Sequence, residues 1–250
     1  MRLLALDAST EACSVALRVG DQMIHRHEEG TGGQAERLLE LIAELLAEAG
    51  LRPAALDAIA AGVGPGAFTG VRLGVAVAQG LAFGASLPVV PITTLEALAW
   101  PAVAAGPVLA CLDARMGEVY WGCYRADPRR GVAPLIAPCV GPIESVRLLE
   151  SMNSLESVNL PASMNPLESV RADALAPRRG VGRGFAAYPR LAALAGVEVS
   201  GSDARALPDA RDLARLGVLR VALGEGIDPA ALAPLYVRDK VAATEAERGV

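Results

Sequence analysis

One stretch of the chain, Gly62–Gly84, constrains its fold more than any other. It reads GVGPGAFTGVRLGVAVAQGLAFG, and its first part is a loop in which glycines surround Pro65. Glycine adopts the positive-φ conformations that a tight turn requires. In the helix that follows, Arg72 and Gln79 are the only strongly polar residues before Phe83. The stretch therefore predicts a glycine-rich loop that leads into a helix of about four turns, apolar and buried on nearly all sides.

Small residues recur along this predicted helix. Gly70, Gly74 and Ala78 lie four residues apart, and Gly80 and Gly84 continue the spacing on another side. A glycine inside a helix costs about 1 kcal/mol relative to alanine, so close packing against another backbone has to compensate. We expect this helix to form the centre of a helix–helix contact, partly within the chain and partly with another chain. At ~1.5 Å per residue it is too short to cross a bilayer.

Hydrophobic periodicity places this helix in a mixed α/β fold. Three strands open the chain, and the second of them alternates strictly between apolar and polar positions. Two later strands are apolar throughout, which is typical of the buried parallel part of a sheet. A helix separates the two groups, so the order favours a mixed sheet with helices on its faces. The predicted strands are Leu3–Asp7, Ala12–Val19, Gln22–Glu28, Asp57–Val63 and Leu87–Ile92.

A second helix is predicted at Gln34–Ala49. One of its sides carries glutamates at i, i+4 spacing, and such like charges favour a side that faces water. Its apolar side is wider than a helix needs to cover one sheet, because Leu39 and Leu46 lie beside the main stripe. The excess is either a partner-binding face or a deeper groove in the chain's own core. The main stripe consists of Leu38, Leu41, Ile42 and Leu45.

The second half of the chain repeats the first in outline. Leu6-Asp7-Ala8 ends the first strand and Leu112-Asp113-Ala114 ends a later strand, and an alternating strand follows each. The repeat indicates two related subdomains, which we assign to residues 1–104 and 105–250. The sequence SMNSLESV at Ser151–Val158 returns as SMNPLESV at Ser163–Val170. We interpret residues 151–170 as an insertion in the second subdomain without a chemical role.

Composition limits the function classes. Hydrophobic residues make up 52% of the chain and support a substantial core. The net charge of −5 and the lack of a basic run argue against a nucleic-acid groove on this chain alone. No signal peptide is visible, and no apolar run reaches the ~18 residues of a membrane span. The four cysteines lack CxxC spacing and are expected in the core. We expect a soluble, cytoplasmic protein without a membrane segment.

The sequence does not contain a complete catalytic set. The Gly64–Gly70 loop lacks the Gly-Lys-Ser/Thr of a Walker A motif and misses the GxGxxG spacing by one residue. We therefore favour a structural loop over a phosphate cradle. Asp7-Ala8-Ser9-Thr10 stands where actin-like ATPases place a phosphate-contacting turn, but the Cβ of Ser9 crowds the approach of a phosphate. His25 and His27 share one face of a strand and lack a third ligand. We expect no metal and no catalytic residue in this chain.

Three segments resemble the bacterial TsaB (YeaZ) family. They are LLALDASTEACSVAL near the start, GVGPGAFTGVRLGVAVAQGLAFG in the centre and PLYVRDKVA near the end. The match covers most of the chain in the same order, and the central segment is highly specific. The resemblance implies an actin-like ATPase (ASKHA) fold of two duplicated subdomains, each with a mixed sheet flanked by helices. The repeat at 151–170 departs from the family pattern.

The resemblance also implies a function. Members of this family are non-catalytic partners of TsaD in the complex that forms N6-threonylcarbamoyladenosine (t6A) at position 37 of tRNAs reading codons that begin with A. TsaD is a catalytic paralogue with a metal-binding HxxxH, whereas Gln34-Ala35-Glu36-Arg37-Leu38 opens the comparable helix here. The implied partners are a TsaD-like protein and a TsaE-like ATPase, with tRNA reached only through the complex. No cofactor is expected on this chain alone, and ATP or ADP and metal are expected on the partner subunits.

Two enzyme classes remain as alternatives to this non-catalytic role. One is a metallopeptidase of the glycoprotease type, a label attached to relatives of this fold, and it needs a metal site. The other is an actin-like phosphotransferase, against which Ser9 argues.

The resemblance places the partner interface on the helices Gln34–Ala49 and Thr69–Gly84, which pack against the same helices of TsaD or of a second copy of the chain. We expect Leu45→Arg or Gly74→Leu to weaken association more than they lower the melting temperature. The predicted interface residues are Leu38, Leu41, Ile42, Leu45, Gly70, Arg72, Gly74, Val77, Ala78 and Leu81. The residues of the preceding loop are Gly64, Pro65, Gly66, Phe68 and Thr69.

Overall fold

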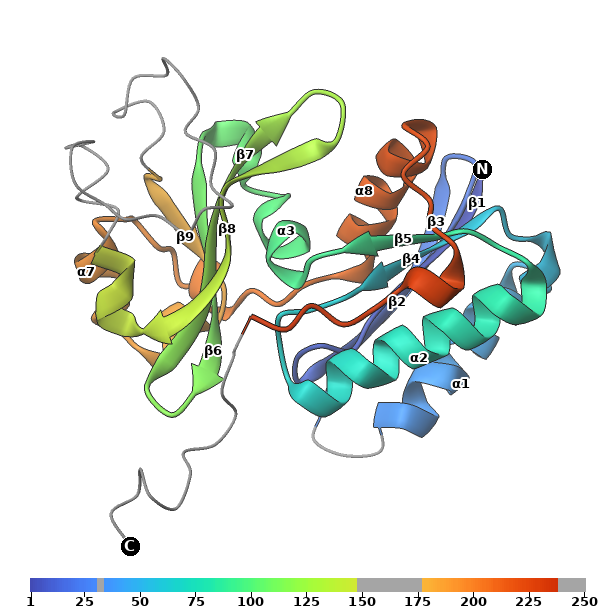
Figure 1. Ribbon diagram of the computed structural model, residues 1–250, viewed down its shortest axis with the longest axis horizontal. Helices are drawn as coiled ribbons and strands as arrows, with labels where there is room; N and C mark the ends of the chain where they lie inside the picture. The colour runs from blue at the N-terminus through green and yellow to red at the C-terminus, as the bar shows by residue number, and fades with distance from the viewer. Residues whose placement is uncertain (31–33, 148–176, 238–250) are drawn as a thin grey trace, which may run out of the picture.

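Two mixed sheets organise the chain (Figure 1). The structure, a computed structural model, describes residues 1–30, 34–147 and 177–237, so the repeat at 151–170 lies outside the described residues. The first sheet has the order β3-β2-β1-β4-β5, with strands β1 (Arg2–Asp7), β2 (Ala12–Val19), β3 (Gln22–Glu29), β4 (Ala58–Gly62) and β5 (Val89–Ile92). The second has the order β8-β7-β6-β9, with strands β6 (Val108–Arg115), β7 (Glu118–Asp127), β8 (Gly131–Pro142) and β9 (Arg179–Val181).

The two sheets share one topology. In the first, β1 pairs antiparallel with β2 and parallel with β4, and β2 pairs antiparallel with β3. In the second, β6 pairs antiparallel with β7 and parallel with β9, and β7 pairs antiparallel with β8. The repeated Leu-Asp-Ala therefore stands near the end of the equivalent strands β1 and β6. This confirms the prediction of two duplicated units.

Helices cover both faces of the first sheet and the outer face of the second (Figure 1). The predicted order of three strands, helix, strand, helix and strand is confirmed for residues 1–92. The helices are α1 (Gln34–Glu48), α2 (Phe68–Ala85), α3 (Thr94–Ala99), α6 (Gly184–Ala187), α7 (Leu191–Ala195) and α8 (Ala210–Ala222). Short 3-10 turns lie at Pro53–Ala55, Val103–Ala105, Ile143–Arg147, Asp203–Arg205 and Pro229–Ala231.

Strand alternation divides the core into layers. Successive side chains of a strand point to opposite faces of its sheet. Leu4 and Leu6 of β1 therefore pack with α1 and α2, whereas Leu3 and Ala5 pack with α3, α8 and the second sheet. A third cluster joins the outer face of the second sheet to α6 and α7. The first unit thus presents α1 and α2 as its outermost layer.

The predicted boundary of the second subdomain, residues 105–250, is wrong for the end of the chain. Helix α8 returns to the first sheet, and a Cβ at Gly217 would lie 2.8 Å from the Cβ of Ala60. The segment after it crosses α2, because Gln79 donates hydrogen bonds to the carbonyls of Pro229 and Leu232, each at 3.0 Å. The reason is physical: the inner face of the first sheet needs a covering helix, and α8 supplies its apolar side.

Candidate functional site

Helix α2 has a sheet-facing side that is buried in the chain's own core. A Cβ at Gly74 would meet the backbone nitrogen of Ala8 at 3.7 Å and the carbonyl oxygen of Gly62 at 3.8 Å. These are ordinary van der Waals distances, so Gly74 packs against β1 and β4 at a position where an alanine would also fit. The buried residues of this side are Gly70, Val71, Gly74, Val75, Ala78 and Ala82.

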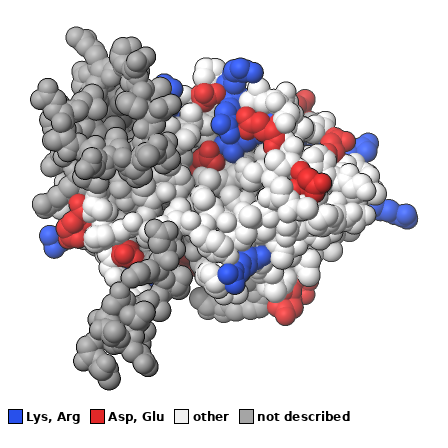
Figure 2. Space-filling model, viewed as in Figure 1, with Lys and Arg blue, Asp and Glu red and all other residues white. Residues whose placement is uncertain are grey.

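The opposite side of α2 is exposed and mostly uncharged, and we call it the outer side of α2. Phe83 is 57% exposed and Phe68 is half-exposed, and a Cβ at Gly80 or Gly84 would meet nothing within 4 Å. Figure 2 shows that the surface over α2 carries few charged side chains. The single chain therefore buries one side of this helix, and the predicted burial of the other side against another chain stays a prediction. The outer side consists of Phe68, Arg72, Ala76, Gly80, Phe83 and Gly84.

Helix α2 is also longer than predicted. Its 18 residues have a mean hydropathy of 1.3, which meets the length and composition criteria for a membrane span, contrary to the prediction that it is too short. A core helix of a globular protein passes the same test, and one side of α2 packs against the first sheet. We therefore interpret α2 as a core helix with one uncovered side.

The structure corrects the choice of interface residues on α1. The predicted stripe packs against the first sheet, and Leu45, for example, is 0% exposed. A side chain without exposed surface cannot contact a partner, so Leu45→Arg and Gly74→Leu would disturb the fold itself. The predicted residues buried in this way are Leu38, Leu41, Ile42, Leu45, Gly70, Gly74 and Ala78. Val77 and Leu81 are partly buried, and Arg72 is exposed.

Arginines balance much of the acidic side of α1. Arg37 forms an ion pair with Glu28 of β3, and its Nη1 lies 3.0 Å from a carboxylate oxygen of Glu40 and of Glu44. Arg26 Nη2 lies 2.7 Å from Glu48 Oε2. These contacts raise the pKa of the Arg37 guanidinium, with the hydrogen bond to Glu28 as the largest cause. Leu39 remains 52% exposed beside this network. Among the described side chains of α1, Leu39 is thus the large hydrophobic one that is exposed.

The glycine-rich loop covers the turn between β1 and β2. The amide of Ala67 donates to the carbonyl oxygen of Ser9 at 2.7 Å, and a Cβ at Gly66 would overlap that same oxygen. Gly64 has φ +96° and its carbonyl accepts from the amide of Thr94 at 2.9 Å. The loop therefore packs directly against the Ser9 backbone, and Ser9, Gly66 and Ala67 also line the cleft described below.

Asp7 lies beneath this loop and is almost completely buried. Its Oδ1 accepts hydrogen bonds from the amide of Ser9 at 2.9 Å and from the hydroxyl of Ser9 at 2.7 Å, while Thr94 Oγ1 lies 2.9 Å from the Ser9 hydroxyl. Its Oδ2 rests against Gly62 and has no hydrogen-bond partner within the described residues. Burial raises the pKa of Asp7 to about 6.

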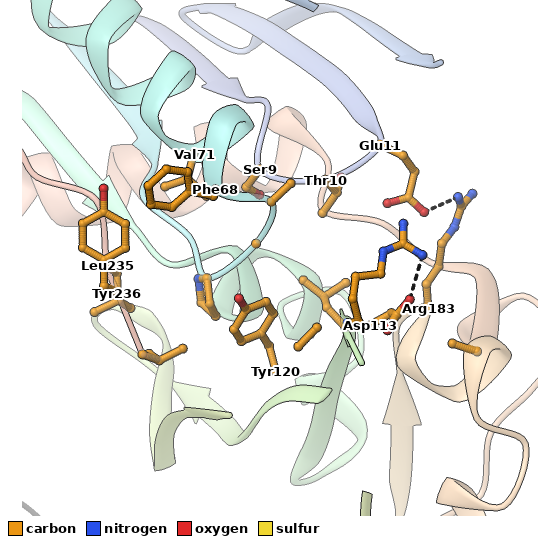
Figure 3. Close-up of a pocket in the computed structure, with 18 of the residues that line it drawn as sticks. Ser9, Thr10, Glu11, Phe68, Val71, Asp113, Tyr120, Arg183, Leu235 and Tyr236 are labelled. Carbon is orange, nitrogen blue, oxygen red and sulfur yellow. Dashed lines mark hydrogen bonds and ion pairs between the residues drawn. The ribbon is translucent and has the colours of Figure 1, made fainter. Parts of the chain in front are cut away.

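A cleft of about 1040 Å³ separates the two units (Figure 3). At one end Arg183 bridges the units, because its Nη1 lies 2.6 Å from Glu11 Oε1 and its Nη2 contacts Glu29. At the other end Phe68 and Tyr236 face the cleft from opposite elements. Asp113, the counterpart of Asp7, lines the cleft and pairs with Arg115, at 3.0 Å.

The described residues form no group of three His, Cys, Asp or Glu side chains that could hold a metal ion. His25 and His27 lie on the edge strand β3, and His27 Nδ1 is 3.1 Å from the hydroxyl of Ser14. Asp7, the carboxylate at the expected nucleotide position, does not line the cleft. The described lining of the cleft presents groups for hydrogen bonding, ion pairing and apolar contact.

Sequence reasoning missed the residues that the second unit contributes to the cleft. Arg183 stands between Gly182 and Gly184, and a Cβ at either glycine would crowd Cys111 of β6. An arginine that stands between two glycines is the signal that could have identified it. Met116 lies at the tip of the β6–β7 hairpin and gives no comparable signal in the sequence.

Comparisons with known proteins agree with this architecture. A family model described as "TsaD: tRNA N6-adenosine threonylcarbamoyltransferase" matches residues 33–243. The chain is 38% identical to the Haemophilus influenzae "tRNA threonylcarbamoyladenosine biosynthesis protein TsaB" over 252 residues, which cover 96% of this chain and 95% of that protein. It is 46% identical to the Escherichia coli protein of the same name over 131 residues, 51% of this chain and 56% of the other.

Solved structures show the same fold. "YeaZ from Pseudomonas aeruginosa" has a TM-score of 0.71 and 35% identity, and covers 94% of this chain and 99% of that one. A second structure, of an uncharacterized protein "with similarity to peptidase YEAZ" from the same organism, has a TM-score of 0.72 and 36% identity, and covers 95% and 99% of the two chains. The repeated sheets and these matches confirm the predicted actin-like fold, and the chain belongs to the TsaB (YeaZ) family.

Proposed function

We propose that this chain is a non-catalytic scaffold and activator subunit in the formation of t6A at position 37 of tRNAs reading codons that begin with A. It binds a TsaD-like catalytic paralogue, works with a TsaE-like ATPase and reaches tRNA only through the complex in the cytoplasm. ATP or ADP and metal are held by the partner subunits. The names of the Haemophilus influenzae and Escherichia coli relatives support the pathway.

The outer side of α2 is the observation that carries the scaffold role. An exposed helix side that combines two phenylalanines with glycines is costly in water and suits close helix packing. The residues with which this helix packs against the chain's own sheet are on the sheet-facing side. The glycines of the outer side would therefore allow a second helix to pack closely against α2.

The non-catalytic role draws support from the β1–β2 turn. A phosphate bound there would need hydrogen-bond donors, and the amide and the hydroxyl of Ser9 both donate to Asp7 Oδ1. A metal bound there would need an accessible carboxylate, and Asp7 is buried with its Oδ1 engaged by Ser9. Both features favour a subunit that supports chemistry on another chain.

The same outer side of α2 suits a second copy of this chain. A two-fold contact uses one patch on both subunits, so the exposed α2 stripe would pack against itself. In this proposal the homodimer and the complex with the catalytic paralogue compete for one surface.

Reconstituted tRNA threonylcarbamoylation tests the proposal. Purified TsaC, TsaD and TsaE homologues are assayed with and without this chain, and the chain is assayed alone. We expect modification to require the chain and the chain alone to be inactive. Equal modification without the chain would contradict the scaffold role.

One solved relative is described as similar to a peptidase, so the metallopeptidase alternative has a separate test. The purified chain is analysed for zinc and iron and incubated with a casein substrate. We expect neither metal at stoichiometric level and no cleavage. Stoichiometric metal together with cleavage would replace the proposal by an enzymatic one, and ATP turnover by the isolated chain would favour the phosphotransferase.

A further inference from the structure

Exposed hydrophobic side chains gather at the rim of the cleft. Within the described part of the chain, six large hydrophobic residues are exposed, and three of them, Phe68, Met116 and Tyr236, line the cleft. They come from three separate elements: α2, the β6–β7 hairpin and the segment after α8. Met116 is 85% exposed at the hairpin tip. Large apolar side chains held in this way at one rim mark a binding site.

A charged aromatic platform forms part of this rim. The Arg72 guanidinium lies 3.7 Å from the ring centroid of Phe68 and 5.6 Å from that of Tyr236. Its Nε donates a hydrogen bond to the hydroxyl of Tyr236 at 2.7 Å. The described residues provide no acceptor for its two Nη groups. The stack therefore fixes the Arg72 guanidinium in place, and its two Nη groups can donate hydrogen bonds to an anionic group.

The other arginines that line the cleft are already paired. Arg183 holds Glu11 and Glu29 at the far end, and Arg115 holds Asp113 on the second unit. Figure 3 shows the Glu11–Arg183 pair at the end opposite Phe68 and Tyr236. The cleft is therefore closed by an ion-pair bridge at one end and open at the Arg72 platform, which holds the one available cation among the described lining residues.

The chemistry of the cleft fits a polypeptide better than a nucleotide. Its volume of about 1040 Å³ lies at the upper end of the ~300–1,000 Å³ range of small-molecule sites, so size alone does not select between the two. At Ser9, which lines the cleft, the amide and the hydroxyl both donate to Asp7 Oδ1, so neither is left to bind a phosphate. The remaining lining includes aliphatic side chains such as Leu112, Ala186 and Leu235, which suit apolar residues.

We propose that the open end of the cleft receives an extended segment of the catalytic partner, with apolar side chains against Phe68, Met116 and Tyr236 and an acidic group on Arg72. Two observations select this occupant. The available Arg72 cation complements an acidic group, and the rim is continuous with the outer side of α2 through Phe68 and Arg72. The inference rests on the proposed function, because it assigns the segment to the partner that α2 binds.

Binding measurements with Met116 variants test the inference. Met116 belongs to the second unit and not to α2, so its substitution leaves the outer side of α2 intact. Met116→Asp removes an apolar contact and adds a negative charge, and we expect it to weaken the complex of the full chain with the TsaD homologue at least tenfold. Met116→Leu should retain wild-type affinity. Arg129→Gln, at the exposed β7–β8 hairpin, changes the net charge equally and serves as the matched control.

A fluorescent probe tests whether a segment enters the cleft. An environment-sensitive dye is attached to Met116→Cys in a Cys139→Ser background, because Cys13, Cys111 and Cys123 are buried. Addition of the TsaD homologue should shift the dye emission to shorter wavelength, whereas ADP or ATP alone should not. A nucleotide that binds the isolated chain and is lost in Met116→Asp would overturn the inference in favour of a nucleotide site.

The outcomes separate the inference from the proposed function. If Ala76→Arg on the outer side of α2 weakens the complex and Met116→Asp does not, the proposed function stands and the cleft inference is wrong. If Met116→Asp alone weakens it, the cleft inference stands and the α2 interface is wrong. If neither variant changes binding, both are wrong.

Discussion

The two sides of α2 contain similar residues, yet they meet different surroundings. On the sheet-facing side, a Cβ placed at Gly74 would lie within contact distance of the backbone of Ala8 and Gly62. The outer side has Gly80 in open space and Phe83 largely exposed. The first side is explained by the chain's own fold, whereas the second is not. A helix that is apolar on nearly all sides can therefore serve two interfaces, and the single chain forms one of them.

The largest effect is expected from charges placed on the two sides of α1. Leu45 is fully buried against the first sheet, and Leu39 is half-exposed on the same helix. Leu45→Arg buries an unpaired charge and should cost more than about 4 kcal/mol of unfolding free energy. Leu39→Arg should change it by less than about 0.5 kcal/mol. Urea denaturation of both variants checks the pair, and similar costs would break the distinction between the two sides.

A second effect concerns Asp7, beneath the sheet-facing side of α2. Burial raises its pKa from 3.8 to about 6, so the folded chain binds this proton more tightly than the unfolded chain does. Stability therefore falls as the pH rises from about 4 to about 6 and stays lower above that range. The shift corresponds to on the order of 3 kcal/mol.

Asp7→Asn removes this titration and keeps an oxygen for both Ser9 hydrogen bonds. Between about pH 4 and about pH 8, the unfolding free energy of the wild type should fall relative to that of Asp7→Asn by most of this ~3 kcal/mol. Denaturation of both proteins across this range measures it, and other carboxylates cancel in the difference. A difference that does not depend on pH would show that Asp7 is not a buried, destabilised carboxylate.

The smallest effect is expected from Gly80. No heavy atom lies within 4 Å of a Cβ placed there, so Gly80→Ala should raise the unfolding free energy by roughly 0.5–1 kcal/mol through helix propensity. Thermal unfolding monitored by circular dichroism checks the sign. A loss of stability would mean that the outer side of α2 is packed within the chain, which would remove the contrast between its two sides.

Much of the fold could be predicted from the sequence, because alternation and apolar runs are local signals. The strand order of the first unit and the helices α1 and α2 follow from such patterns. The packing side of α2 could not be predicted, since both of its sides are apolar. The return of α8 to the first sheet was missed because sequence order does not specify which sheet a helix covers.

The candidate site was harder to predict than the fold, because it is assembled from distant segments. Arg183 and Glu11 are 172 residues apart in the chain and meet across the cleft. Tyr236 reaches Arg72 over 164 residues. No periodicity links such pairs. On α1, the wide apolar arc left a partner face and a deeper core groove both open, and the resemblance assigned the stripe to the interface. The arc alone gives no indication of how deeply the helix sits in its own core.

The affinity of this chain for a TsaD homologue, measured with Ala76→Arg, tests whether the outer side of α2 binds the partner. Ala76 lies exposed on the outer side of α2, and Ala193→Arg on α7 makes the same change at an exposed helix position of the second unit. We predict at least a hundredfold loss of affinity for Ala76→Arg, an unchanged melting temperature, and wild-type affinity for Ala193→Arg. Wild-type affinity for Ala76→Arg would contradict the assignment of the outer side of α2 as the partner interface.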